Sequence, residues 1–112
     1  EVLQQTTSYT IRDLTIDKEK FTVLRGQQPI ALTPTEFNLL LVLASAPDRV
    51  FSRMQLVDKV QGGYGFEGYE RTIDTHIRNL RKKLEPDPAH PTYILTVYGI
   101  GYKFDGGNHE ES

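Results

Sequence analysis

The sequence contains no cysteine, so it has neither a disulfide nor a thiolate ligand for a metal. It also contains no apolar run near the ~18 residues that a membrane-spanning helix requires. No secretory signal peptide is recognisable at its beginning. These absences lead us to expect an intracellular, cytoplasmic protein without a membrane segment.

Patterns for catalysis and metal binding are also missing. None of the histidines, which are His76, His90 and His109, is followed by a second ligand at the third or fourth position. The serines have no histidine and aspartate arranged for nucleophilic catalysis. The segment Gly99-Ile100-Gly101 is not followed by a helix whose N-terminus could bind a phosphate. We therefore expect no enzymatic activity, no metal and no cofactor.

What the sequence does contain is a local concentration of positive charge. The 112 residues fit one globular domain, and a net charge of −2 argues against indiscriminate binding to polyanions. Residues 70–84 nevertheless hold five basic and two acidic side chains. A localised basic surface of this kind is what contact with phosphates requires.

Residues 70–84 also have the pattern of an amphipathic α-helix. An apolar stripe recurs at helical spacing through Ile73, Ile77, Leu80 and Leu84. The opposite face mixes long cations with amide and hydroxyl groups that can reach base edges, and it carries Arg71, Thr75, Arg78, Asn79 and Lys82. The two borders carry Thr72, Asp74, His76, Arg81 and Lys83. A solvated charged face is the plain alternative, but few acidic side chains lie four residues earlier to balance the cations.

The first third of the chain predicts a small sheet. We interpret residues 1–8 as a linker. Four short β-type runs follow at residues 9–12, 14–17, 21–24 and 29–32, with turn-prone segments between the later ones. Connections this tight predict a four-stranded antiparallel meander with one face on the core.

Two capping boxes mark the starts of helices. Thr33-Pro34-Thr35-Glu36 starts a helix that ends at Pro47. After a brief strand at residues 50–51, Ser52-Arg53-Met54-Gln55 starts a second helix that extends to about Val60. A glycine-rich loop at residues 61–69 then leads to the basic helix.

The last part of the chain predicts a hairpin. Three prolines between residues 86 and 91 prevent further helix, and residues 93–98 and 102–104 are β-forming runs around a glycine turn. Residues 106–112 have no apolar side chain and are predicted to be disordered. The whole order predicts an α+β fold, a winged helix-turn-helix over residues 9–105, in which the basic helix enters a major groove beside the hairpin, or wing.

Several motifs carry a family resemblance. LTPTEF at 32–37, VFSR at 50–53, RTIDTHIR at 71–78, LRKKL at 80–84 and TVYGIGY at 96–102 resemble the effector domain of OmpR/PhoB-type response regulators. The resemblance covers about residues 8–105 and implies a bacterial two-component transcription factor whose receiver domain would precede residue 1. It also implies sequence-specific binding to double-stranded DNA, with two copies head-to-tail on direct-repeat half-sites.

The resemblance also implies site residues. The family's DNA-contacting helix positions correspond to Arg71, Thr72, Asp74, His76, Arg78, Asn79 and Arg81. We add Thr75 and Lys82 from the outer face of the helix and Thr96, Tyr98 and Gly99 from the wing. In relatives the loop before this helix contacts RNA polymerase, which implies that role for Gln61, Tyr64, Phe66 and Glu67.

Two residues depart from the family pattern, and two questions stay open. Many members have arginine where this chain has Tyr98, and tryptophan where it has Gln61. Tyr98 either contacts DNA from the wing tip or packs inward on Tyr93 or Tyr102.

The alternative function is a winged-helix protein-interaction module whose basic helix docks on an acidic partner. Binding to duplex DNA that depends steeply on salt and on sequence would separate the two functions.

Overall fold

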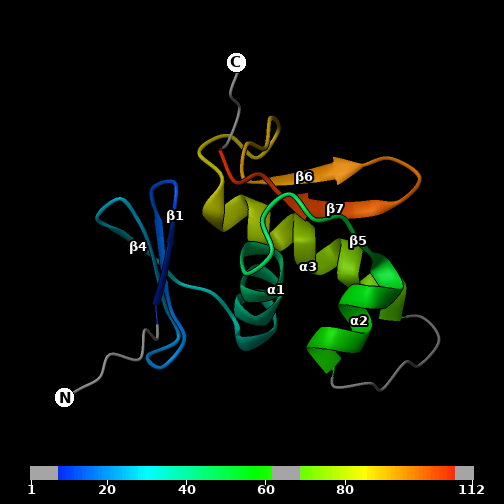
Figure 1. The fold of residues 1–112 in the computed structure, drawn as a ribbon, viewed down its shortest axis with the longest axis horizontal. Coiled ribbons are helices and arrows are strands. Elements are labelled where there is room, and N and C mark those ends of the chain that lie inside the picture. Colours follow the sequence, from blue (N-terminus) through cyan, green and yellow to red (C-terminus); the bar gives the residue numbers. More distant parts are fainter. Residues whose placement is uncertain (1–7, 62–68, 108–112) are drawn as a thin grey trace.

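A computed structural model describes residues 8–61 and 69–107 of the chain. Its strands and helices follow one another as β1 (Ser8–Ile11), β2 (Leu14–Asp17), β3 (Thr22–Arg25), β4 (Gln28–Ile30), α1 (Pro34–Ala44), β5 (Phe51–Ser52), α2 (Arg53–Gln61), α3 (Tyr69–Leu84), β6 (Ile94–Val97) and β7 (Gly101–Phe104). This order confirms the α+β winged helix-turn-helix (Figure 1). No helix in the described part of the chain is long and apolar enough to cross a membrane.

The N-terminal sheet is the predicted antiparallel meander, in the order β1-β2-β3-β4. Leu14, Ile16 and Val23 turn inward and are almost fully buried. One strand begins later than predicted. Phe21 has a φ of +55°, which an extended strand does not allow, so β3 starts at Thr22. The fourth strand ends at Ile30, before the cap of α1.

Both capping boxes are present. In α1, Thr33 Oγ1 accepts from the Glu36 N–H at 3.2 Å, and the Glu36 carboxylate accepts from the Thr33 N–H at 3.0 Å. In α2, Ser52 and Gln55 exchange the same two hydrogen bonds at 3.1 and 2.9 Å. Each box satisfies two backbone N–H donors that a helix start leaves unpaired, which explains why both helices begin where the sequence predicts.

The core lies around α1, which Figure 1 shows between the N-terminal sheet and the other two helices. The buried face of α1 is wide, because helices pack on one side of α1 and the sheet on the other. Leu39 and Leu43 are fully buried in addition to Phe37 and Leu40, whereas Leu41 is only half-buried.

The C-terminal hairpin is the predicted wing. β6 and β7 pair antiparallel with Thr96 opposite Tyr102, and β5 adds a third strand in the order β5-β7-β6. The turn places Gly99 at a φ of +81°. Gly101 is required for a different reason, since a Cβ there would lie 1.9 Å from the carbonyl oxygen of Phe51. In Figure 1 the wing lies along α3.

Candidate nucleic-acid interface

α3 has the two faces that its sequence predicts. Ile73, Ile77, Leu80 and Leu84 are at most 2% exposed and form the inner stripe. On the opposite side Thr75, Arg78 and Lys82 are exposed, and His76 and Asn79 are half-buried. The side chains of Arg71 and Thr72 lie outside the described residues. The surface formed by residues 75, 76, 78, 79 and 82 is called the outer face below.

The cations of α3 differ in what they contact. Arg78 and Lys82 are exposed and form no ion pair with any side chain that the structure describes, so their charges face solvent. Lys83 instead donates to the buried Glu36 of α1 at 2.7 Å. Arg78 and Lys82 are therefore the described cations of the helix that are available to a polyanion.

Asp74 and Arg81, both predicted to contact DNA, are bonded to other parts of the protein. Asp74 Oδ1 accepts from the Tyr102 hydroxyl at 2.7 Å and lies 3.5 Å from Arg53 Nε. Arg81 donates from Nε and Nη2 to the Ile94 carbonyl at 3.1 and 2.8 Å. Sequence periodicity placed these two side chains on the borders of the outer face, where the wing in fact packs.

The wing partners of these residues are correspondingly constrained. Thr96 Oγ1 accepts from Arg81 Nη2 at 2.8 Å, and the Arg81 guanidinium lies 5.5 Å from the centre of the Tyr102 ring. Burial, together with the hydrogen bond to Asp74, raises the pKa of Tyr102 to about 12. Thr96, a predicted DNA-contacting residue, is half-buried against the helix.

Tyr98 projects from the wing tip. Its side chain is 90% exposed, and the nearby Ile100 is 60% exposed. Tyr93 is buried at the base of the wing, where its hydroxyl donates to Asp13, and burial raises its pKa to about 12. The alternative in which Tyr98 packs on Tyr93 or Tyr102 is therefore wrong. Gly99, beside it in the turn, is also exposed.

A hollow of about 480 Å³ lies between the start of α2, α3 and the wing. Arg53 and Met54 line it together with Asp74 and the wing residues from 96 to 102. Sequence reasoning assigned Arg53 and Met54 only to a helix start. Their position directly after the Ser52 cap is the sequence feature that could have indicated a place for an anion, since the first turn of a helix carries unpaired N–H groups that attract anions.

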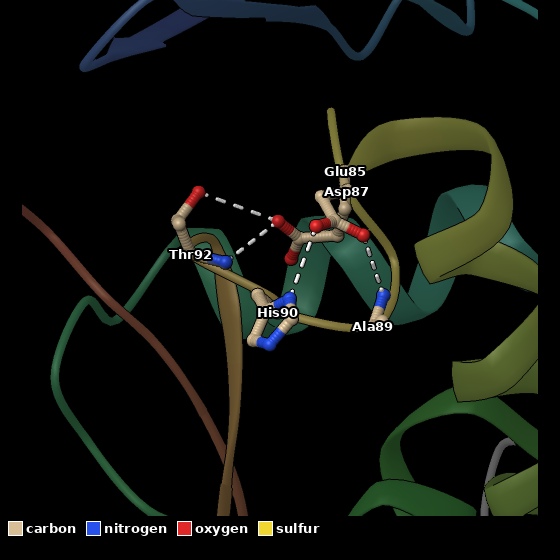
Figure 2. Close-up of polar contacts among 5 residues, drawn as sticks. All are labelled: Glu85, Asp87, Ala89, His90 and Thr92. Carbon is tan, nitrogen blue, oxygen red and sulfur yellow. Dashed lines mark hydrogen bonds and ion pairs between the residues drawn. The ribbon is translucent and has the colours of Figure 1, made fainter.

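The loop between α3 and β6 has its own polar contacts, which Figure 2 shows. His90 Nδ1 lies 3.0 Å from the Asp87 carboxylate, and hydrogen bonds from His90 and from the Ala89 N–H lower the pKa of Asp87. Both side chains are largely exposed. The described residues contain no group of three or more potential metal ligands of the His, Cys, Asp and Glu types.

The side chains predicted to contact RNA polymerase lie outside the described residues. Gln61 is the last residue of α2, but its side chain lies outside the described ones. Tyr64, Phe66 and Glu67, predicted to contact RNA polymerase, also lie outside the described residues. The geometry of the interface therefore rests on α3, the start of α2 and the wing.

Comparison with known proteins agrees with this geometry. The family described as "Transcriptional regulatory protein, C terminal" matches residues 26–104. The chain is 49% identical over 92 residues to the uncharacterized transcriptional regulatory protein YclJ of Bacillus subtilis, covering 81% of this chain and 39% of YclJ. It is 44% identical over 94 residues to the DNA-binding response regulator MtrA of Mycobacterium tuberculosis, covering 84% and 41%. The chain thus spans about two fifths of the length of these relatives.

Solved structures show the same fold. The DNA-binding domain of RstA from Klebsiella pneumoniae, in complex with the RstA box, superposes with a TM-score of 0.81 at 31% identity, covering 90% of this chain and 99% of that one. The DNA-binding domain of CpxR from E. coli gives a TM-score of 0.76 at 29% identity, covering 91% and 100%. The chain belongs to the family of C-terminal, DNA-binding effector domains of OmpR/PhoB-type transcriptional regulatory proteins.

Proposed function

We propose that this domain binds double-stranded DNA in a sequence-dependent manner, with the outer face of α3 in a major groove and the wing tip on the adjacent backbone or minor groove. One observation carries the proposal: the exposed cations Arg78 and Lys82 share a helix face with Asn79, and an exposed aromatic tip projects beside that helix. The likeness to the RstA domain, whose structure is a complex with its DNA box, supports it.

The outer-face residues have different roles in this proposal. Lys82 neutralises a phosphate, and Arg78 binds either a phosphate or a guanine edge. Asn79 can pair with adenine through its amide, and Thr75 and His76 complete the surface that faces the groove. At the wing tip, Tyr98 and the backbone of Gly99 position the domain. Arg71 and Thr72 remain predicted contacts at the start of α3.

The proposal extends to the assembly on DNA. Each chain has one recognition-type helix, so two half-sites require two copies, which we place head-to-tail on a direct repeat. MtrA is named a response regulator, and the relatives are more than twice as long as this chain, which supports a receiver domain N-terminal to the effector. RNA polymerase contact through residues 61–67 stays a prediction. DNA as the ligand implies a cytoplasmic location.

Footprinting the domain on genomic fragments, followed by affinity measurements at several salt concentrations, tests the proposal. We expect protected direct repeats, and a steep decrease of affinity with salt for these sites. Equal affinity for the protected site and for random duplex would contradict sequence readout. Absence of duplex binding, with capture of an acidic protein, would favour the interaction module.

A further inference from the structure

The wing is attached to α3 by a row of polar side chains on one side of the helix. Asp74, Arg81 and Glu85 are separated by seven and four residues, spacings that return to nearly the same direction around a helix. Glu85 directly follows α3, and its N–H still donates to the Arg81 carbonyl at 2.9 Å, so it keeps the helical spacing. These three residues form what we call the wing seam.

The three members of the seam together bond to both strands of the hairpin, from its base to the level of the Thr96–Tyr102 pair. On β7, Asp74 accepts from the Tyr102 hydroxyl. On β6, Arg81 donates to the Ile94 carbonyl and to Thr96 Oγ1. At the base, the Glu85 carboxylate, only 3% exposed, accepts from three successive backbone N–H groups at 2.7, 3.0 and 2.9 Å, those of residues 92, 93 and 94. Figure 2 shows the bonds from Thr92 to Glu85.

Arg81 connects α3 to the wing through its guanidinium group. Two of its three nitrogens are bonded to β6, and its guanidinium lies near the face of the Tyr102 ring. The half-buried side chain therefore crosses from the helix to both strands of the wing. Arg78 and Lys82, on the outer face, have no such contacts among the described residues. The two kinds of cation on α3 thus perform different tasks.

We propose that Asp74, Arg81 and Glu85 are positioning residues for DNA binding: they hold the wing at a fixed place relative to α3, so that Tyr98 and the outer face reach one duplex together. The inference rests on the proposed function. Its physical basis is preorganisation, because a wing that is ordered before binding avoids the entropic cost of ordering on the DNA.

Arg81→Lys is the main test, because it keeps the positive charge but loses the planar fork that bonds both Ile94 and Thr96. We expect affinity for the specific site to decrease on the order of tenfold, the value of one hydrogen bond to a charged group. In the free protein, amide hydrogen exchange in β6 and β7 should accelerate. If the Arg81→Lys variant retained full affinity for the specific site and slow amide exchange in the wing, the proposal would be overturned, since only the charge at this position would matter.

A double-mutant cycle separates positioning from direct contact. If Arg81 acts through the wing, Arg81→Lys should have little effect in a Tyr98→Ala background, whereas two independent DNA contacts would give additive losses. Lys82→Gln is the matched control on the outer face. It should flatten the salt dependence by ~0.9 and leave the exchange of the wing amides unchanged. Additive losses in the cycle would overturn the positioning role.

Tyr102→Phe gives a second, milder variant should Arg81→Lys unfold the domain. It removes only the hydroxyl that donates to Asp74 and keeps the ring beneath Arg81. We expect faster exchange near the wing tip and weaker specific binding, and no change in either would contradict the seam. Hydrogen exchange is measured without DNA, so it tests the seam alone. A wild-type domain that binds no specific duplex would instead refute the proposed function.

Discussion

Lys83 Nζ lies 2.7 Å from Glu36 Oε1, and this ion pair joins the end of α3 to the first turn of α1. The Glu36 side chain is almost fully buried, and the same oxygen accepts from the Thr33 N–H in the capping box. Burial raises the pKa of Glu36, but the hydrogen bonds from Lys83 and Thr33 and the charge of Lys83 outweigh it, so the pKa is lowered from 4.5.

The lowered pKa predicts a pH-dependent stability. Because the folded state binds the proton of Glu36 less tightly than the unfolded state, the carboxylate stabilises the fold above about pH 4.5. That contribution is lost as the pH decreases through the lower pKa of the folded state. We expect Glu36→Gln to reduce the free energy of unfolding by about 1–3 kcal/mol at pH 7, because it breaks a largely buried pair. Below pH 4.5 the variant and the wild type should converge in urea denaturation.

Lys83→Met controls for the capping box, since it removes the ion pair but leaves the Thr33 contact with Glu36 in place. With Lys83 gone, the buried Glu36 carboxylate keeps only its capping contact, so the pH dependence should shrink or change sign, and stability at pH 7 should decrease at least as much as in Glu36→Gln. A stability difference between Glu36→Gln and wild type that stays constant from pH 7 to pH 3 would rule out this linkage.

A second stability prediction concerns Glu85, whose carboxylate accepts from three backbone N–H groups of the wing base. Glutamine keeps the size but offers one acceptor oxygen and directs two N–H groups toward other donors. We expect Glu85→Gln to destabilise the domain by about 1–3 kcal/mol in thermal or urea denaturation. Asp87→Asn, in the exposed part of the same loop, should cost little. Similar losses of stability in both variants would show that the loop as a whole, and not the buried Glu85 carboxylate, stabilises the domain.

The sequence predicted the elements well because their signals are local. Both capping boxes lie within four residues, and the apolar stripe of α3 is a periodicity inside one helix. The partners of the polar border residues are not local. Lys83 and Glu36 are 47 residues apart, and Tyr102 lies 28 residues beyond Asp74. Periodicity puts a side chain on a border, but only tertiary packing decides whether that border faces DNA or the wing.

Base readout is predicted for Asn79 and charge neutralisation for Lys82. Asn79→Ala should relax the preference at one base position at a cost of ~1–3 kcal/mol, because an amide can pair bidentately with adenine. Lys82→Ala should weaken binding to every sequence alike and flatten the salt dependence by about one unit. Competition assays with single-base operator variants measure both effects. If Asn79→Ala weakened specific and random DNA equally, its assignment to base readout would be wrong.

Tandem binding predicts a dependence on helical phase. Two head-to-tail copies on a direct repeat should contact each other only when the half-site centres are about one turn apart. The isolated domain should be largely monomeric in solution and bind cooperatively on the repeat. Adding ~5 base pairs between half-sites turns the second copy to the opposite side and should abolish cooperativity, whereas ~10 should preserve the relative orientation. Cooperativity that is unchanged by the half-turn insertion would disprove the tandem arrangement.

Substitutions at Tyr98 test whether the wing tip contacts DNA. It is 90% exposed at the tip, so Tyr98→Arg should leave the melting temperature unchanged. An arginine can enter a narrow minor groove, drawn by its negative potential, and we expect tighter binding, most on A·T-rich flanks. The salt dependence should steepen by ~0.9 for one additional phosphate neutralised. Tyr98→Phe should cost ~1 kcal/mol or less if one hydroxyl bond is lost.

Ile100→Arg is the matched control, because it adds the same charge to an exposed position two residues away in the same turn. If Tyr98 occupies the position from which the wing reaches the groove, only Tyr98→Arg should distinguish A·T-rich from G·C-rich flanks, since recognition of groove width requires insertion. Charge at Ile100 should increase affinity for all flanks equally, through longer-range attraction. Equal flank preference in the two variants, measured by titration at matched salt, would show that the tip acts through its charge alone and that Tyr98 does not define the point of contact.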